Sequence, residues 1–398
     1  MPRPALVLAA VLLSAAAPAA AQTTPSTSAA DSAGATQAAP DAVQAAPPDF
    51  PRGKISGYMF GELYYNVAGD PAHIYDANGA DAGQAAIDTK KNITRDLNGA
   101  QLRRAYFQLD NDLTARFATR FRLEADSRSL TSDGKIGVAV KAAYLQAKSV
   151  VPRGDFYFGI LSTPTFENAE EFWQYRSIEK TMADFHGMPS ADVGVELKGY
   201  ADADHHVGYA AMIGDGPGQK PETDRFKKLY LSLPIRFGDL RIEPYVDYQA
   251  IRVGTDKVKP VQPDSAAVNY DQATYKIFAG YEFRRAALGV EVLDRVNHKG
   301  PLRNEEWRGL SVFARGSATP ALGAFARFDY WISDERNPDR VDSRQWIVGL
   351  DWRPLPDIHV MPNIEAAQYQ ARGRGVAPAH DDLQARVTFY YKFSKPQS

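Results

Sequence analysis

The feature that most constrains the fold is an alternation of apolar and polar side chains that recurs in about sixteen segments between residues 54 and 393. In ARFATRFRLEAD (115–126), Phe117, Phe121 and Leu123 alternate with arginines and a glutamate. A period of two predicts a β-strand with one apolar face and one charged face. Most of the segments have about the ten residues that a tilted strand needs to cross a membrane.

Long and short connections alternate between these segments. The segment 54–68 is followed by a long polar stretch, whereas 101–110 turns at once through Asn111 and Asp112, and 226–237 turns through Gly238 and Asp239. Long loops on one side and short turns on the other are typical of transmembrane β-barrels. We therefore expect an all-β, sixteen-stranded antiparallel transmembrane barrel. The alternative is a soluble all-β protein, in which the apolar faces pack on a core.

In a membrane barrel one face of each strand contacts lipid and the other faces the lumen. A charge that faces lipid costs a few kcal/mol at the midplane, so the charged faces must point into a water-filled lumen. Arginines and lysines outnumber carboxylates on these inward faces, which predicts a pore wall that attracts anions. The candidate pore-lining and anion-binding residues are Arg104, Arg116, Arg120, Arg122, Arg327 and Arg353.

The N-terminal segment suggests export. Residues 1–21 combine a basic start, a short apolar run and a small-residue cleavage pattern, which predicts a signal peptide. Residues 22–52 are rich in Ala and Pro with almost no large apolar residue, so we expect a disordered periplasmic leader before a barrel at 53–398. The chain has no cysteine, hence no disulfide, and no apolar segment long enough for a transmembrane helix.

The connection 167–191 differs from the others because it favours a helix. Acidic residues, Glu171 among them, lie early, where a helix N-terminus favours negative charge. Trp173, Arg176 and Lys180 then follow at a spacing that places them on one helical face. We interpret this segment as a constriction loop whose cations face the solute. The alternative is an ordinary extracellular loop with a solvated helix.

The stretch GILSTPTFENAEEFWQYR, followed by ADVGVELKGY, resembles the porin O/P family of phosphate-selective porins. QLRRAYFQLD and KAAYLQAK resemble that family's second and fourth strands, and the resemblance covers residues 54–393. The chain departs from the family in lacking a clear lysine cluster for the extracellular funnel and in ending with SKPQS after Phe393. The matching positions are Gly159, Pro164, Glu171, Trp173, Arg176, Asp192, Gly194 and Gly199.

The resemblance implies a channel in the outer membrane of a Gram-negative bacterium, in contact with lipid and assembled as a homotrimer. It implies a third loop that folds into the barrel, and passive diffusion of small anions such as phosphate, held in transit by lumenal arginines and lysines. A porin of the same fold for sugars or organic acids, and a barrel that acts as an adhesin or cell-wall tether through its leader, remain alternatives.

The sequence suggests no other chemistry. His205 and His206 lie beside Asp202 and Asp204, but adjacency is not ligand geometry, and we interpret all four as exposed turn residues. No nucleophile pairs with a base, so we expect no catalytic residue and no enzyme activity. We expect no metal, no cofactor and no nucleic-acid partner.

Overall fold

The computed structural model describes residues 49–71, 93–253, 268–299, 302–373 and 380–396, without the side chains of 128, 129, 252, 253, 268 and 396. The predicted signal peptide and all but the last residues of the predicted leader lie outside this part of the chain. The first strand already begins at Arg52, one residue before the predicted start of the barrel.

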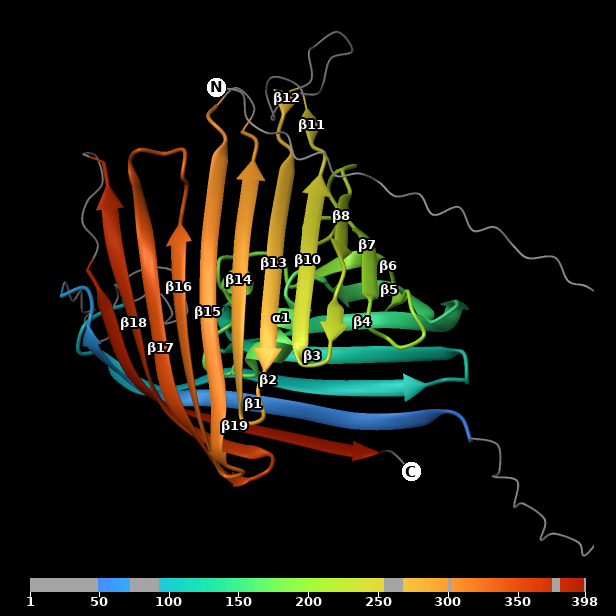
Figure 1. Cartoon of the computed structure of the whole chain (residues 1–398), viewed down its shortest axis with the longest axis horizontal. Helices are drawn as coiled ribbons and strands as arrows, with labels where there is room; N and C mark the ends of the chain where they lie inside the picture. The colour runs from blue at the N-terminus through green and yellow to red at the C-terminus, as the bar shows by residue number, and fades with distance from the viewer. Residues whose placement is uncertain (1–48, 72–92, 254–267, 300–301, 374–379, 397–398) are drawn as a thin grey trace, which may run out of the picture. The chain divides into compact units, whose positions relative to one another are not determined.

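Sixteen antiparallel strands close into a barrel, as the alternation predicted. Each strand pairs with its neighbour in the sequence, and the last strand pairs with the first through contacts such as Tyr58 with Lys392. Figure 1 shows strands of opposite walls crossing at a steep angle, as tilted barrel strands do. The first half comprises β1 (Arg52–Ala68), β2 (Asn98–Asp112), β3 (Phe117–Leu130), β4 (Ile136–Val151), β5 (Gly154–Ser162), β6 (Ala191–Tyr200), β7 (Gly208–Gly214), and β8 (Lys228–Ser232) with β9 (Ile235–Phe237). The second half comprises β10 (Leu240–Gln249), β13 (Gln272–Glu282), β14 (Ala286–Asn297), β15 (Glu305–Thr319), β16 (Leu322–Ile332), β17 (Arg340–Leu355), β18 (Ile358–Arg372) and β19 (Asp382–Pro396).

Two predicted strands are interrupted. The segment 226–237 forms β8 and β9, which both pair with β10 and therefore occupy one position in the barrel. Pro234 lies between them and has no N–H to donate, which breaks the ladder there. The segment 240–253 ends as a barrel strand at Gln249, and β11 (Arg252–Val253) pairs beyond it with β12 (Val268–Asn269).

One predicted turn lies further along the chain than expected. β2 continues through Asn111 and Asp112, and the chain turns at residues 113–116. Hydrogen bonds from the amides of Leu113 and Thr114 to the carbonyl of Phe117 close this turn. Arg116 therefore precedes β3 and is exposed in the turn, rather than lying on the strand as the alternation suggested.

The outer surface of the barrel is apolar. On β17, Trp346, Val348 and Leu350 are 47%, 58% and 51% exposed, whereas the alternate residues Gln345 and Asp351 are buried inside. The same division holds on β8, where Leu229 and Leu231 face outward and Lys228 faces inward. The predicted sorting of the two faces is thus confirmed on these strands, and the outer face forms the surface that lipid requires.

A lysine in the middle of this surface should destabilise the barrel. Val348 lies near the centre of β17, so we expect Val348→Lys to lower the free energy of unfolding in a bilayer by about 2–4 kcal/mol. Leu355→Lys at the end of the same strand should cost at most about 1 kcal/mol, because the side chain reaches the interface. Reversible urea unfolding in lipid vesicles measures both; equal costs would show that β17 does not span the membrane.

Two short helices lie inside the barrel. They are α1 (Glu167–Trp173) and α2 (Met182–Phe185), both in the connection between β5 and β6. Within the described residues, no helix is long and apolar enough to cross a membrane. α1 contacts β13, β14 and β15, which lie across the lumen from β5. The third loop therefore folds inward, as the resemblance implied.

Candidate pore and its inward loop

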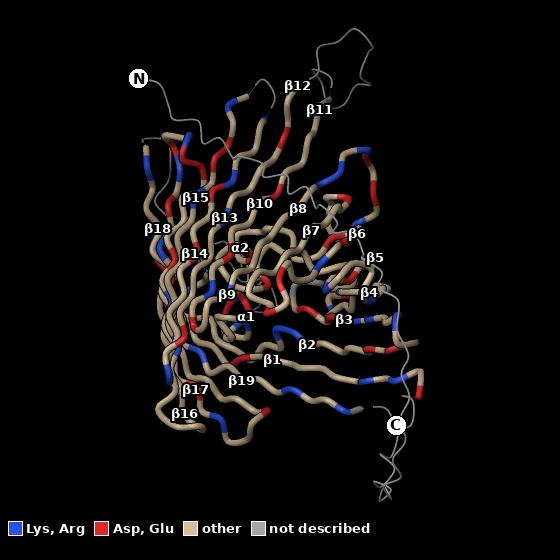
Figure 2. Tube along the Cα trace, turned by 45° about the vertical axis from the view of Figure 1, so that its right-hand side comes forward, with Lys and Arg blue, Asp and Glu red and all other residues tan. Residues whose placement is uncertain are grey.

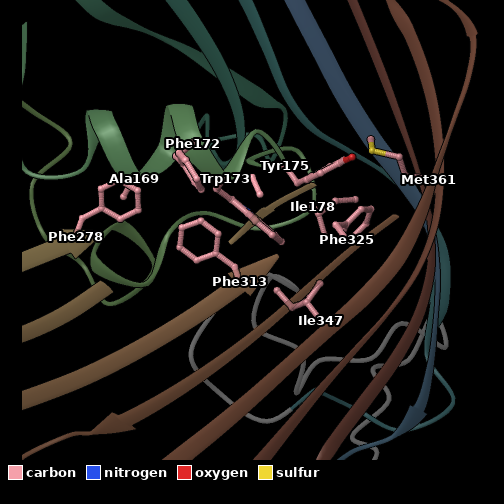
Figure 3. Close-up of a cluster of buried hydrophobic side chains, with 11 residues drawn as sticks. Ala169, Phe172, Trp173, Tyr175, Ile178, Phe278, Phe313, Phe325, Ile347 and Met361 are labelled. Carbon is pink, nitrogen blue, oxygen red and sulfur yellow. The ribbon is translucent and has the colours of Figure 1, made fainter. Parts of the chain in front are cut away.

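An apolar cluster fastens the inward loop, residues 163–190, to one wall of the barrel. Phe172 and Trp173 are 1% and 0% exposed and pack on Phe313 and Phe325 of the wall. The ring centroids of Trp173 and Phe313 are 5.3 Å apart and the ring planes meet at 68°, an edge-to-face arrangement that favours aromatic packing. Figure 3 shows these side chains between the loop and the strands beneath it. The loop is thus docked on this wall by buried aromatic side chains.

The predicted single helical face of Trp173, Arg176 and Lys180 is wrong. α1 begins at Glu167, as its early acidic residues suggested, but it ends at Trp173. Gln174 follows with a φ of 66°, a left-handed conformation that ends a helix. Trp173 consequently points into the wall, while Arg176 and Lys180 meet at Asp184 through the irregular chain that follows.

Three wall arginines hold the backbone of the loop. Arg315 donates to the carbonyl of Phe172 (2.9 Å) and Arg103 donates to that of Ile178 (2.7 Å). Arg327, 3% exposed, donates to the carbonyl of Lys180. Because these guanidinium groups lie beneath the loop, they position it. Arg327 was a candidate for the pore wall, and the structure places it under the loop instead.

The structural role of Arg327 is reinforced by its other contacts. Its Nε donates to both carboxylate oxygens of Asp329 at 2.9 Å. Its guanidinium carbon lies 5.7 Å from the ring centroid of Trp173, a cation–π contact. This arginine therefore links the wall to both the aromatic and the backbone contacts of the loop.

An open cavity of about 590 Å³ lies on the other side of the loop, against β1–β5 and β17–β19. Figure 2 shows basic and acidic residues interleaved around the loop. The basic residues that line the cavity outnumber the acidic ones by six to four. The basic residues are Arg120, Arg122, Lys141, Arg176, Arg353 and Lys392, and the acidic ones are Glu167, Glu170, Glu171 and Asp351.

Several of the predicted cations are paired with carboxylates. Arg120 contacts Asp110 at 2.6 Å and Arg353 contacts Asp351 at 2.7 Å, yet both still line the cavity. Arg104 is buried. Its Nε lies 3.4 Å from a carboxylate oxygen of Glu124 and 3.1 Å from one of Asp126.

Arg122 differs from the other candidates. Its Nε donates to the side chain of Gln108 at 2.6 Å, and among the described residues it forms no ion pair. It lines the cavity together with Arg120 on the same face of β3. Of the six candidates for the pore wall, Arg120, Arg122 and Arg353 thus reach the open lumen beside the loop.

Arg176 lies at the centre of a group of charges on the side of the loop next to the cavity. It contacts Glu170 at 2.7 Å and Asp184 at 3.1 Å, and it donates to the hydroxyl of Tyr106 at 3.3 Å. Lys180 also pairs with Asp184, at 3.5 Å. Glu171 projects away from this group and contacts Arg241 at 3.1 Å. The four constriction residues that the sequence suggested therefore point in three directions.

The pKa values of the two carboxyl groups in this cluster shift in opposite directions. Burial raises the pKa of Glu170 above its ordinary value, although the adjacent Arg176 opposes that shift. Burial also disfavours ionisation of Asp184, but Arg176 and Lys180 together outweigh it and lower the pKa of that carboxyl.

Sequence reasoning missed two of the residues that define the loop and the cavity. Arg103 and Arg104 are adjacent, so a strict two-residue period sends one of them outward. The register between β1 and β2 shifts between Phe60 and Gly61, so Arg103 is an extra, bulged residue of β2, and both arginines face inward. Lys141, which donates to Ser190 at 2.7 Å, was also missed. The consecutive RR in strand β2 was the signal that could have revealed Arg103.

Asp202, Asp204 and His206 bring potential ligand atoms within 4.8 Å of one another in the turn between β6 and β7. The carboxylate of Asp202 already accepts from the amides of His206 (2.9 Å) and Val207 (2.8 Å). These bonds account for the arrangement as a turn closed by an aspartate, as the sequence suggested.

No protein-family model matches the sequence, and no curated protein matches it. Solved structures do match its fold. The outer membrane channel DcaP of Acinetobacter baumannii is 12% identical with a TM-score of 0.60, over 86% of this chain and 97% of that one. The anion-selective porin from Comamonas acidovorans is 12% identical with a TM-score of 0.58, over 86% of this chain and 100% of that one. The trimer form of OmpT, an outer membrane protein of Vibrio cholerae, is 12% identical with a TM-score of 0.56, over 87% of this chain and 100% of that one.

These similarities concern the fold. A closed sixteen-stranded antiparallel barrel with an apolar outer surface and an inward loop is the architecture of an outer-membrane porin. The chain is therefore an outer-membrane β-barrel with the porin fold.

Proposed function

We propose that this protein is a passive channel for small solutes and that it prefers anions. The observation that carries the proposal is the open cavity beside the inward loop, where six basic side chains face four acidic ones. Fixed positive charge along a narrow aqueous passage raises the local concentration of anions and repels cations. Arg122, which forms no ion pair among the described residues, is the cation best placed to meet a solute.

The similar structures support this proposal without deciding it. One of them is described as an anion-selective porin and another as an outer membrane channel. Because a third was solved in a trimer form, we extend the proposal to a homotrimer. Slow migration of the unheated protein in a denaturing gel, lost on boiling, is the expected result for a stable trimer. Migration as a monomer without heating would contradict it.

Ion selectivity tests the function directly. We expect the purified full-length protein to form open channels in a planar bilayer, with a reversal potential in a potassium chloride gradient that shows chloride to be more permeant than potassium. A channel that prefers potassium would refute the anion preference, and a protein that carries no ion current would refute the function.

Phosphate is the specific anion that the sequence resemblance implied. Guanidinium groups hold phosphate oxygens in a bidentate geometry, which supports phosphate as a permeant solute. If phosphate has an affinity site here, low concentrations of it should reduce the chloride current. The measurement is made at a mildly alkaline pH, where phosphate is mainly a dianion. Sulfate is then the matched control, because it also carries two negative charges but has no hydrogen-bond donor. Equal effects of the two anions would indicate charge preference alone.

A further inference from the structure

Two open cavities inside the barrel meet at a small group of tyrosines and cations. The first is the cavity beside the inward loop, and the second, of about 390 Å³, extends toward the turn between β17 and β18. The residues that line both cavities are Tyr58, Tyr106, Arg122, Tyr390 and Lys392. A solute that moves from one cavity to the other must therefore pass these five side chains.

The five residues form a strip across four adjacent strands. Tyr58 on β1 lies opposite Tyr106 on β2 and opposite Lys392 on β19. The ring centroids of Tyr58 and Tyr106 are 4.4 Å apart, and those of Tyr58 and Tyr390 are 5.9 Å apart, with interplanar angles of 31° and 34°. Arg122 on β3 continues the strip beyond β2, so the aromatic surface has a cation at each end.

Several polar groups of the strip remain available to bind a solute. Tyr106 is buried against Tyr58, whereas Tyr58 and Tyr390 are partly exposed. Within the described residues the hydroxyl groups of Tyr58 and Tyr390 form no hydrogen bond, and Arg122 forms no ion pair. Lys392 is half exposed and lies 3.3 Å from Asp357, so it is the weaker of the two cations.

We propose that this strip is an affinity site for planar aromatic carboxylates, with the ring stacked on Tyr58 and Tyr390 and the carboxylate held by Arg122. The proposal deepens, and rests on, the channel function proposed above. Aromatic rings attract one another in offset and tilted arrangements, and a guanidinium group binds a carboxylate through two parallel hydrogen bonds. An inorganic anion would leave the tyrosine faces unused, and a neutral sugar would leave Arg122 unused.

Block of the potassium chloride current by added solutes tests the site. Benzoate and cyclohexanecarboxylate have the same charge and similar size, but only benzoate is planar and aromatic. We expect benzoate to half-block the current of the full-length channel at a concentration about 2- to 10-fold lower than cyclohexanecarboxylate. Arg122→Gln should raise the half-blocking concentrations of both acids, because both carboxylates lose the guanidinium group.

Substitutions of the tyrosines isolate the aromatic contribution. Tyr58→Leu should reduce the difference between the two acids, and Tyr58→Leu combined with Tyr390→Leu should abolish it. Tyr58→Phe should keep the difference because the ring remains. Tyr275→Leu is the matched control, since Tyr275 is 56% exposed on the outer face of β13. Tyr275→Leu should leave the difference between the two acids unchanged. That result would show that the effect depends on the tyrosines of the strip and not on the loss of a tyrosine elsewhere.

The outcomes separate this site from the function on which it rests. Equal block by benzoate and cyclohexanecarboxylate in a conducting channel would overturn the aromatic site while leaving the porin function intact. Stronger block by a neutral maltooligosaccharide than by benzoate would overturn it in favour of a sugar site. Absence of any ion current from the wild-type protein would instead refute the porin function.

Discussion

Replacing Arg176 by alanine should reduce the preference for chloride over potassium by roughly tenfold. A unit charge about 4 Å from a passing ion contributes about 1 kcal/mol even at the permittivity of water. The contribution has opposite signs for the two ions, and salt screens part of it. The change removes the guanidinium group and leaves Glu170 and Asp184 without their shared partner.

The reversal potential in a potassium chloride gradient measures this change. Arg176→Lys should retain most of the preference, and Glu170→Gln should increase it because it removes a negative charge from the same cluster. Arg340→Ala is the matched control, since Asp342, the partner of Arg340, keeps its contact with Arg372 at 3.1 Å. An unchanged reversal potential for Arg176→Ala would remove Arg176 from the selectivity mechanism.

Replacing Trp173 by alanine should release the inward loop without unfolding the barrel. The side chain is fully buried between the loop and the wall, and loss of such a side chain costs about 3–5 kcal/mol. The substitution should destabilise the docked position of the loop and not the barrel, because the strands are held by their own ladder of hydrogen bonds. We expect a larger single-channel conductance with more current noise, since the loop then leaves part of the lumen open.

Trp346→Ala provides the matched control for this prediction. Trp346 is 47% exposed on the outer face of β17, so its loss should leave both the conductance and the noise unchanged. Trp173→Phe should lie near wild type, because an aromatic ring still fills much of the site. A folded Trp173→Ala barrel with wild-type conductance would show that Arg103, Arg315 and Arg327 suffice to hold the loop.

The alternation of side chains determined the barrel itself. Each strand residue faces either lipid or the lumen. The polarity that a position such as Val348 or Leu229 requires is therefore set by the lipid or water that its side chain meets. That information is local and has a period of two, which is why the number of strands, the outward faces on β8 and β17, and the alternation of loops and turns could be predicted. The prediction of individual strands was less accurate where the period breaks, at Pro234 and at Arg103.

The roles of the lumenal arginines were decided by the tertiary structure alone. Arg120 and Arg327 have the same local signature, an arginine on the inward face of an alternating strand. Arg120 meets open lumen, whereas Arg327 lies beneath Lys180, a residue 147 positions away in the chain. The inward loop crosses to the opposite wall and covers some cations while leaving others exposed. A strand pattern records which face a side chain takes; it holds no information on what a distant segment places over that face.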